Sequence, residues 1–436
     1  MAMIRAGVAQ RVITPAGSWP MDGYILRDGP SCGVLDDLLA QVLFLDDGQA
    51  RAALVSLDLV GVDAAFTARL RAAVEERYGV PGRHVLVAAS HTHSGPSGFV
   101  SLWDPAAVDS PLREHVIRRV VEAVGEAGEA AAATRWQVCR AVVEGVGADR
   151  NDPGGRPEDG ADLLLLWRQD GSLAAVVVHY ACHPTVLGPG NRLLATDFVG
   201  PMRRALAAAL AETGYGAPAV LFVNGAAADV SARFTRRDQT PAEARRLGAL
   251  LAAQVLRAIL AARPEDAVVA GPIRALEWEV EVPGRGAGAA DAAEADPAAL
   301  DRAVADARAE LEAARAGGDP HRLRVLRARL EGLLARRWWL APVPAVRVRL
   351  QALVAGDVAW IAVPGELDRE LGEAIRAASP FPHTLLAGYA NDYVGYILGE
   401  RLAAAGTYES LASRLAPGAG EAVRDAAVEL LRRFAG

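Results

Sequence analysis

Two histidines separated by a single residue are the clearest chemical signal in this sequence. The apolar run 85–89 has the length of a buried strand, and it leads directly into Ser90-His91-Thr92-His93-Ser94-Gly95-Pro96. Open α/β sheets build active sites by placing polar side chains at the carboxyl ends of such strands. We therefore expect one of His91 and His93 to bind a metal ion and the other to face the substrate.

Other polar side chains follow apolar runs in the same way. Four further runs end at a polar residue that could take part in catalysis: His183, Ser231, Glu366 and Tyr396. In a mostly parallel sheet, these strand ends meet at one rim. Two imidazoles and a carboxylate are a common ligand set for catalytic zinc, which keeps one position open for water. The residues alone therefore indicate a metal-assisted hydrolase.

Some of these residues also have ordinary structural interpretations. A buried histidine is often only a hydrogen-bonded core residue, and His179, inside its apolar run, fits that role better than His183. Asp197 precedes a predicted helix, so capping is its favoured role. Ser231 either faces the substrate or shapes its loop, and the sequence does not separate the two.

The elements that must position these side chains alternate between strands and helices. Apolar runs predict strands over 41–45, 52–57, 136–146, 163–167, 174–178, 219–223, 273–282, 346–354, 358–363 and 383–387. Helical spacing predicts helices over 63–78, 111–133, 198–213, 240–262, 400–414 and 419–434. The pattern favours an α/β fold with a mixed, largely parallel sheet flanked by helices, forming one catalytic domain over residues 1–436.

One region breaks the pattern. Residues 284–340 are rich in alanine, arginine and glutamate, with Gly317-Gly318-Asp319-Pro320 in the middle. This composition predicts a helical hairpin inserted between two strands, serving as a lid or an oligomer contact. A solvent-exposed arginine face is the more ordinary expectation for such helices.

Composition excludes several classes of function. Of the 436 residues, 52% are hydrophobic and 23% are charged, and the formal net charge is −7. These values are normal for a globular enzyme and lack the basic excess typical of nucleic-acid binding. No apolar run approaches the ~20 residues of a transmembrane helix. With three scattered cysteines and no signal-peptide pattern at the start, we expect a cytoplasmic enzyme that acts on a small molecule and can form a homo-oligomer.

The histidine motif, together with several later motifs, resembles the neutral/alkaline non-lysosomal ceramidase family. The matching pieces occur in order along residues 11 to about 410: Ile13-Thr14-Pro15, Gly23-Tyr24, Ser90 to Pro96, Arg150, His179 to Thr185, Asn224 to Ser231, Pro364-Gly365-Glu366 and Asn391-Asp392-Tyr393 with Tyr396. Each piece is short, but the ordered set is specific.

The resemblance implies one catalytic Zn²⁺ bound by two histidines, a glutamate and a tyrosine, at the positions His91, His183, Glu366 and Tyr396. Tyr393 is the other candidate for the tyrosine ligand, but the spacing to Tyr408 favours Tyr396. The resemblance also places four residues around the substrate: His93, Arg150, Ser231 and Tyr408. Either a metal-activated water or Ser231 could attack the carbonyl. We favour the water, because Ser231 has no evident base beside it in the sequence.

The sequence also departs from that family. Family members usually carry a secretion signal and a C-terminal β-sandwich domain, and we expect neither here. Ala228 and Ala232 stand where the serine motif has glycine and proline, and Asn151 follows Arg150 where a serine is usual. We therefore expect zinc-dependent hydrolysis of an N-acyl amide that is metabolite-sized rather than membrane ceramide. Hydrolysis of an ester or lactone, and a non-catalytic ligand-binding or scaffold role, are the alternatives.

Overall fold

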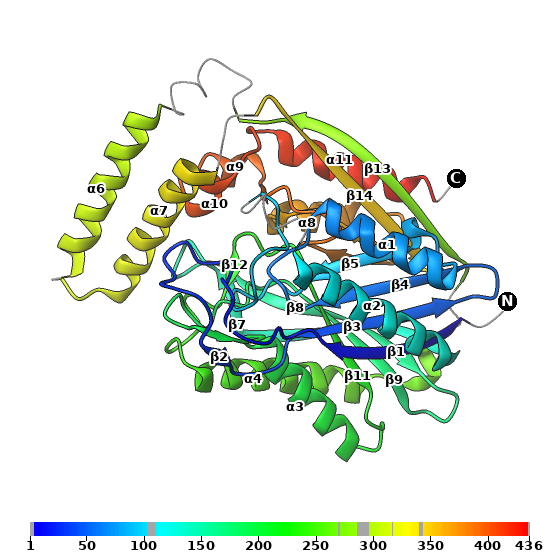
Figure 1. Ribbon diagram of the computed structural model, residues 1–436. Coiled ribbons are helices and arrows are strands. Elements are labelled where there is room, and N and C mark those ends of the chain that lie inside the picture. Colours follow the sequence, from blue (N-terminus) through cyan, green and yellow to red (C-terminus); the bar gives the residue numbers. More distant parts are fainter. Residues whose placement is uncertain are drawn as a thin grey trace.

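Three β-sheets pack around a shared core in a computed structural model of the chain (Figure 1). The structure describes residues 4–102, 110–268, 271–285, 296–315, 317–339 and 343–434. Helices cover the outer faces of the sheets. None of the described helices has both the length and the apolar character needed to cross a membrane.

The first sheet has the strand order β5-β4-β3-β1-β6. Its strands are β1 (Arg5–Val12), β3 (Leu39–Asp46), β4 (Arg51–Leu57), β5 (Val85–Ala89) and β6 (Ala132–Ala133). Two helices, α1 (Ala64–Tyr78) and α2 (Pro111–Glu129), pack on its outer face. Asp63 caps α1 by accepting from the backbone N–H of Phe66, and Gly79 ends it with a left-handed φ of 66°.

The second sheet has the order β11-β9-β8-β7-β12. Its strands are β7 (Arg135–Asp149), β8 (Pro157–Trp167), β9 (Leu173–Tyr180), β11 (Ala219–Asn224) and β12 (Val230–Ser231). Helices α3 (Val199–Glu212) and α4 (Pro241–Ala261) cover it. The side chain of Thr240 accepts from Glu243 N–H at the start of α4, where the sequence predicts a cap.

The third sheet has the order β13-β14-β15-β17. It comprises β13 (Ile273–Pro283), β14 (Ala345–Ala355), β15 (Val358–Ala362) and β17 (His383–Ala387), covered by α8 (Arg369–Ala378) and α11 (Ala419–Arg432). Between β13 and β14 the chain forms α6 (Pro297–Arg315) and α7 (Pro320–Trp339), which pack together through Val304, Ala307, Leu330, Leu333 and Leu334. Residues 286–295, 316 and 340 of the predicted insertion 284–340 lie outside the described residues.

Short elements complete the fold. They are β2 (Gly33–Val34), β10 (Leu193–Leu194), β16 (Glu366–Leu367), β18 (Tyr396–Ile397), α9 (Glu400–Ala403), α10 (Tyr408–Ala412) and the 3₁₀ turns Gly82–His84 and Pro264–Asp266. The helix predicted over 400–414 is therefore two helices. Gly406, with a φ of 67°, interrupts it.

The mixed α/β class is confirmed, but the expectation of a largely parallel sheet is wrong. The long ladders β1–β3, β3–β4, β7–β8, β8–β9 and β13–β14 are all antiparallel. Tight turns such as Asp46-Asp47-Gly48 can join only antiparallel neighbours. Each large sheet holds one parallel pair joined through a helix: β4–α1–β5, β9–α3–β11 and β15–α8–β17.

Candidate metal centre and substrate pocket

The three strand–helix–strand units bring the candidate ligands together. His91 follows β5, His183 follows β9, and Glu366 follows β15. The sheets are joined near this point, since Ala89 N–H donates to Tyr389 O and Gly388 N–H donates to Asn224 O. His183, His91 and Glu366 are only 0%, 1% and 2% exposed. The predicted meeting of strand ends is therefore present, although the sheets are not mainly parallel.

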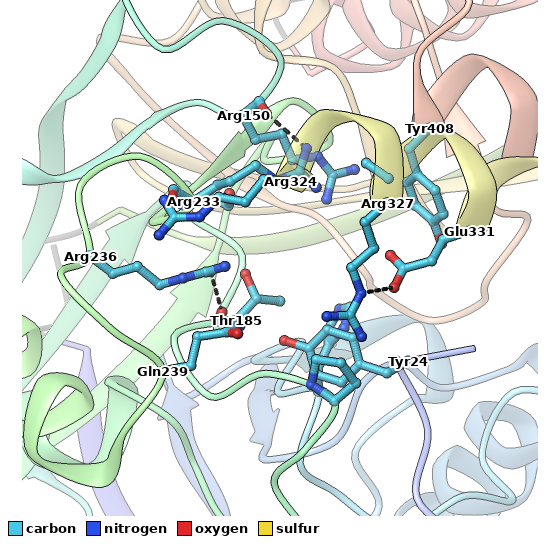
Figure 2. Close-up of a pocket in the computed structure, with 15 residues that line it drawn as sticks. Tyr24, Arg150, Thr185, Arg233, Arg236, Gln239, Arg324, Arg327, Glu331 and Tyr408 are labelled. Atoms are coloured by element: carbon cyan, nitrogen blue, oxygen red, sulfur yellow. Dashed lines mark hydrogen bonds and ion pairs between the residues drawn. The ribbon is translucent and has the colours of Figure 1, made fainter. Parts of the chain in front are cut away.

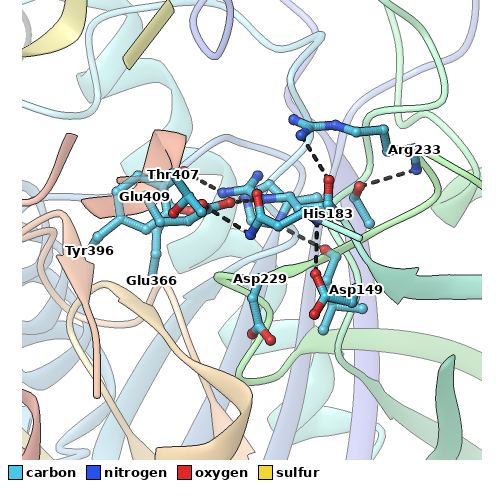
Figure 3. Close-up of polar contacts among 12 residues, drawn as sticks. Asp149, His183, Asp229, Arg233, Glu366, Tyr396, Thr407 and Glu409 are labelled. Atoms are coloured by element: carbon cyan, nitrogen blue, oxygen red, sulfur yellow. Dashed lines mark hydrogen bonds and ion pairs between the residues drawn. The ribbon is translucent and has the colours of Figure 1, made fainter. Parts of the chain in front are cut away.

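Three imidazoles form a compact cluster. One ring nitrogen from each of His91, His93 and His183 lies within 4.8 Å of the others, an arrangement that could hold a metal ion. Glu366 Oε2 lies 2.9 Å from His183 Nε2 and 3.5 Å from His91 Nε2. Figure 3 draws Glu366 and His183 within this polar group. The residue pair chosen from the sequence, His91 and His183, thus shares one centre with Glu366.

The other ring nitrogens fix how these histidines point. His91 Nδ1 lies 2.5 Å from Val60 O, and His183 Nδ1 lies 2.7 Å from Ala227 O. A carbonyl oxygen only accepts, so each Nδ1 carries a proton, and Nε2 is the ring nitrogen left to bind a metal ion. This is the tautomer that metal-bound histidines commonly adopt.

The resulting contact between His183 and Glu366 suits a cation. Burial lowers the pKa of His183 to about 4, although its contact with Glu366 opposes that shift. Burial raises the pKa of Glu366, but attraction to His91 and His183 outweighs that effect and holds it well below the usual value. Glu366 Oε2 and His183 Nε2 lie 2.9 Å apart. Two imidazole nitrogens and a carboxylate gathered at one buried point are a donor set that fits Zn²⁺.

His93 approaches the cluster from a different side. Its Nε2 lies 3.1 Å from His91 Nε2, and its ring makes an edge contact with Tyr24 at 4.9 Å between centroids. Gly23 leaves the space that the ring occupies, because a Cβ there would fall 2.5 Å from a ring carbon. His93 lines two adjoining cavities.

Arg150 and the tyrosines form a second polar group. Arg150 Nε donates to Glu409 Oε1, and Arg150 Nη2 donates to Tyr396 OH at 3.0 Å. The guanidinium also lies 5.5 Å from the ring centre of Tyr408. Tyr393 OH donates to Glu366 Oε1. Tyr396 is hydrogen-bonded to Arg150, and Tyr393 to Glu366, so each of the two candidate tyrosines has a distinct partner.

Ser231 lines the cavity beyond His93. Its Oγ accepts from Arg233 N–H at 3.1 Å. In the described part of the chain, no histidine or carboxylate forms a hydrogen bond with this oxygen. His179 lies inside β9, as the sequence predicts. The predicted helix cap at Asp197 is wrong, because the N-cap residue of α3 is Phe198 and no side chain caps that helix. Asp197 instead accepts from Phe198 N–H and from two loop N–H groups.

Sequence reasoning missed two residues of the site. Tyr389 stacks on His91 with 3.9 Å between ring centroids, and Glu409 is the ion-pair partner of Arg150. Tyr389 follows β17 just as His91 follows β5, so the strand-end pattern could have revealed it. Glu409 is adjacent to Tyr408, but the sequence does not show that α10 starts there.

The fold matches solved ceramidase structures. Neutral ceramidase from Pseudomonas aeruginosa superposes with a TM-score of 0.76 at 19% identity, covering 99% of this chain and 75% of that one. The chain has the neutral ceramidase fold. A ceramidase structure described as complexed with C2 matches equally well, with a TM-score of 0.76, 18% identity and coverage of 99% and 76%. No protein-family model matches the sequence.

Proposed function

We propose that this protein hydrolyses the amide bond of an N-acyl amide with the help of one divalent metal ion, and that the ion is zinc. The observation that carries this proposal is the buried meeting of His91, His183 and Glu366, where Glu366 Oε2 lies 2.9 Å from His183 Nε2 and 3.5 Å from His91 Nε2. The fold shared with neutral ceramidases supports the reaction class.

His91, His183 and Glu366 would hold the ion, with a tyrosine as a fourth ligand. A bound zinc ion polarises a carbonyl and lowers the pKa of a bound water to about 7. Tyr396, favoured by the sequence, pairs with Glu366 in the two-stranded sheet, whereas Tyr393 hydrogen-bonds to Glu366. Both tyrosines therefore remain candidates. Comparing zinc affinity in Tyr393→Phe and Tyr396→Phe distinguishes them, since only loss of the true ligand weakens binding strongly.

The remaining residues act on the substrate. Arg150 and Tyr408 would stabilise the oxyanion of the tetrahedral intermediate. Burial raises the pKa of Tyr408 far above neutral pH, so its phenol keeps the proton that it would donate. His93 would transfer a proton to the leaving amine. Ser231, without a base, would hydrogen-bond to the substrate rather than attack it.

A matched pair of substrates tests the proposal. An N-dodecanoyl amide and the ester of the same acyl group are incubated with the protein, with and without a chelator. We expect amide hydrolysis that the chelator abolishes and that His91→Ala lowers by at least ~100-fold, as for other lost catalytic groups. His115→Ala, in α2 outside the cluster, is the control. Turnover of the ester alone would favour an esterase, and no turnover of either would favour a ligand-binding role.

A further inference from the structure

An arginine-lined cavity adjoins the histidine cluster (Figure 2). This cavity and the one at the histidine cluster are separate cavities that share four lining residues: Gly23, Tyr24, His93 and Tyr408. The cavity has a volume of about 120 Å³, whereas a single water needs only ~10–15 Å³. A polyatomic group therefore fits beside the reacting bond. We call this cavity the arginine pocket, after Arg150, Arg233, Arg236, Arg324 and Arg327, which line it.

Positive charge in the arginine pocket exceeds negative charge. Its only lining carboxylate among the described residues is Glu331, and Arg327 Nε contacts that group at 3.3 Å. Glu409 forms an ion pair with Arg150 and neutralises its charge. The other three arginines form no ion pair within the described part of the chain.

Those three arginines donate to backbone carbonyls instead. Arg233 Nη1 donates to Arg150 O at 2.8 Å, Arg236 Nη1 to Thr185 O at 2.7 Å, and Arg324 Nη1 to Arg233 O at 2.5 Å. Arg236 Nε is buried and has no hydrogen-bond partner among the residues that the structure describes. Burial and the nearby Arg150 lower the pKa of Arg233 to about 10. The guanidinium therefore stays charged near neutral pH, although its surroundings disfavour the positive charge. Guanidinium groups that backbone carbonyls hold in place, and that lack an ion-pair partner, are typical of an anion-binding site.

The insertion supplies one wall of this pocket. Arg324, Arg327 and Glu331 all belong to α7, and α7 packs on α10 through Leu330 and its neighbours and Leu411. Gly332 of α7 lies so close to α10 that a Cβ there would fall 3.2 Å from Tyr408 Cα. The expectation of a solvent-exposed arginine face is therefore wrong for Arg324, which is half-buried and lines the pocket, whereas the Arg327 side chain lines the pocket and stays 42% exposed.

We propose that the arginine pocket binds an anionic group of the substrate, a carboxylate or a phosphate, on the side of the amide bond that faces α7. The inference rests on the proposed amide hydrolysis and narrows its substrate to N-acyl amides that carry such an anion. The guanidinium fork matches both groups, because each accepts two parallel hydrogen bonds. A neutral amide would leave Arg233, Arg236 and Arg324 without an ion-pair partner among the described residues.

Amides that share one acyl chain test this directly. N-dodecanoylglycine carries a carboxylate, N-dodecanoyl-O-phosphoethanolamine carries a phosphate, and N-dodecanoylethanolamine is neutral. We expect kcat/KM for at least one anionic amide to exceed that for the neutral amide by about 10- to 100-fold, the range for hydrogen bonds to charged groups. The better anionic substrate identifies the group. Equal or faster turnover of the neutral amide would overturn the proposal.

Variants on α7 locate the effect. In Arg324→Gln/Arg327→Gln, the preference for the anionic amide is expected to disappear while turnover of the neutral amide changes less than threefold. Arg322→Gln is the matched control, because Arg322 is exposed on the same helix and does not line the pocket. A thermal melt checks that the variants fold. An equal loss for both amides, or the same loss in Arg322→Gln, would contradict the assignment.

Measuring ligand binding tests the arginine pocket independently of amide hydrolysis. If no amide is hydrolysed, calorimetry with N-dodecanoylglycine and with inorganic phosphate still reports on the pocket. Saturable binding that is lost in Arg324→Gln/Arg327→Gln and kept in Arg322→Gln supports an anion site without amide hydrolysis. Absence of binding by both probes, together with no anionic preference, would overturn the inference whether or not the protein is an amidase.

Discussion

At the residue scale, the orientation of the histidines follows from backbone geometry. His91 has a φ of 68°, a left-handed conformation that is costly for a residue with a Cβ. This conformation lets its N–H bond to Leu59 O while its Nδ1 bonds to Val60 O. Tyr389, which has a φ of 54°, stacks on the His91 ring. Strained residues gathered at one buried point support a functional role for this centre.

A buried carboxyl next to the site makes stability depend on pH. Burial, followed by the nearby Asp368, raises the pKa of Asp229 from its ordinary 3.8 to about 6. Because the folded pKa is the higher one, the stability contributed by Asp229 is complete below pH 4 and is lost as the pH rises through about 6. Asp229 O also accepts from Arg150 N–H at 2.9 Å, which ties this loop to the site.

Asp229→Asn removes this titration and keeps an acceptor for Arg369 N–H, which now donates to Oδ1 at 3.0 Å. Relative to the wild type, we expect its free energy of unfolding to rise between pH 4 and pH 7 by up to about 3 kcal/mol, from ~1.4 kcal/mol per pKa unit. Urea unfolding across this range measures the difference. A difference that does not change with pH would show that Asp229 titrates normally.

At the element scale, local patterns predicted most of the pieces but not their pairing. The strand before His91 and the cap at Thr240 depend on nearby residues, so the sequence revealed both. Strand direction depends on which neighbours pair, and that is decided by contacts between distant segments. The position of α7 against α10 is a long-range contact of the same kind. For this reason the family resemblance could name Tyr408, but the sequence could not predict that α7 packs against α10 beside it.

Gly23 offers a test of how one loop positions His93. It has a φ of 100°, and a Cβ there would fall 2.5–2.7 Å from atoms of the His93 side chain. Gly23→Ala should displace the ring and lower kcat for amide hydrolysis by at least ~10-fold, since misplaced groups lose rate steeply.

Gly17→Ala is the matched control. Gly17 has a comparable φ of 87°, but a Cβ there would meet no atom within 4 Å. Both variants therefore carry the cost of a left-handed alanine, about 1–3 kcal/mol, and thermal melts should shift to a similar degree. Equal activity in the two variants would indicate that the space left by Gly23 is not needed to hold His93.

At the scale of the whole molecule, three strand–helix–strand units surround one apolar core. Leu86, Val177 and Trp360, one from each sheet, belong to that core. Each unit delivers one candidate ligand from the carboxyl end of a strand: His91, His183 and Glu366. The centre therefore forms only when all three sheets have packed, which links folding to metal binding. The arginine pocket lies between the histidine cluster and the inserted α7.

The most direct test measures metal content and amide hydrolysis on the same preparation. We predict about one zinc ion per chain by elemental analysis, and hydrolysis that is lost on chelation and regained when zinc is added. His183→Ala should lose both the metal and the activity, and His115→Ala should keep both. Full hydrolysis by metal-free protein, or an active His183→Ala, would contradict the account.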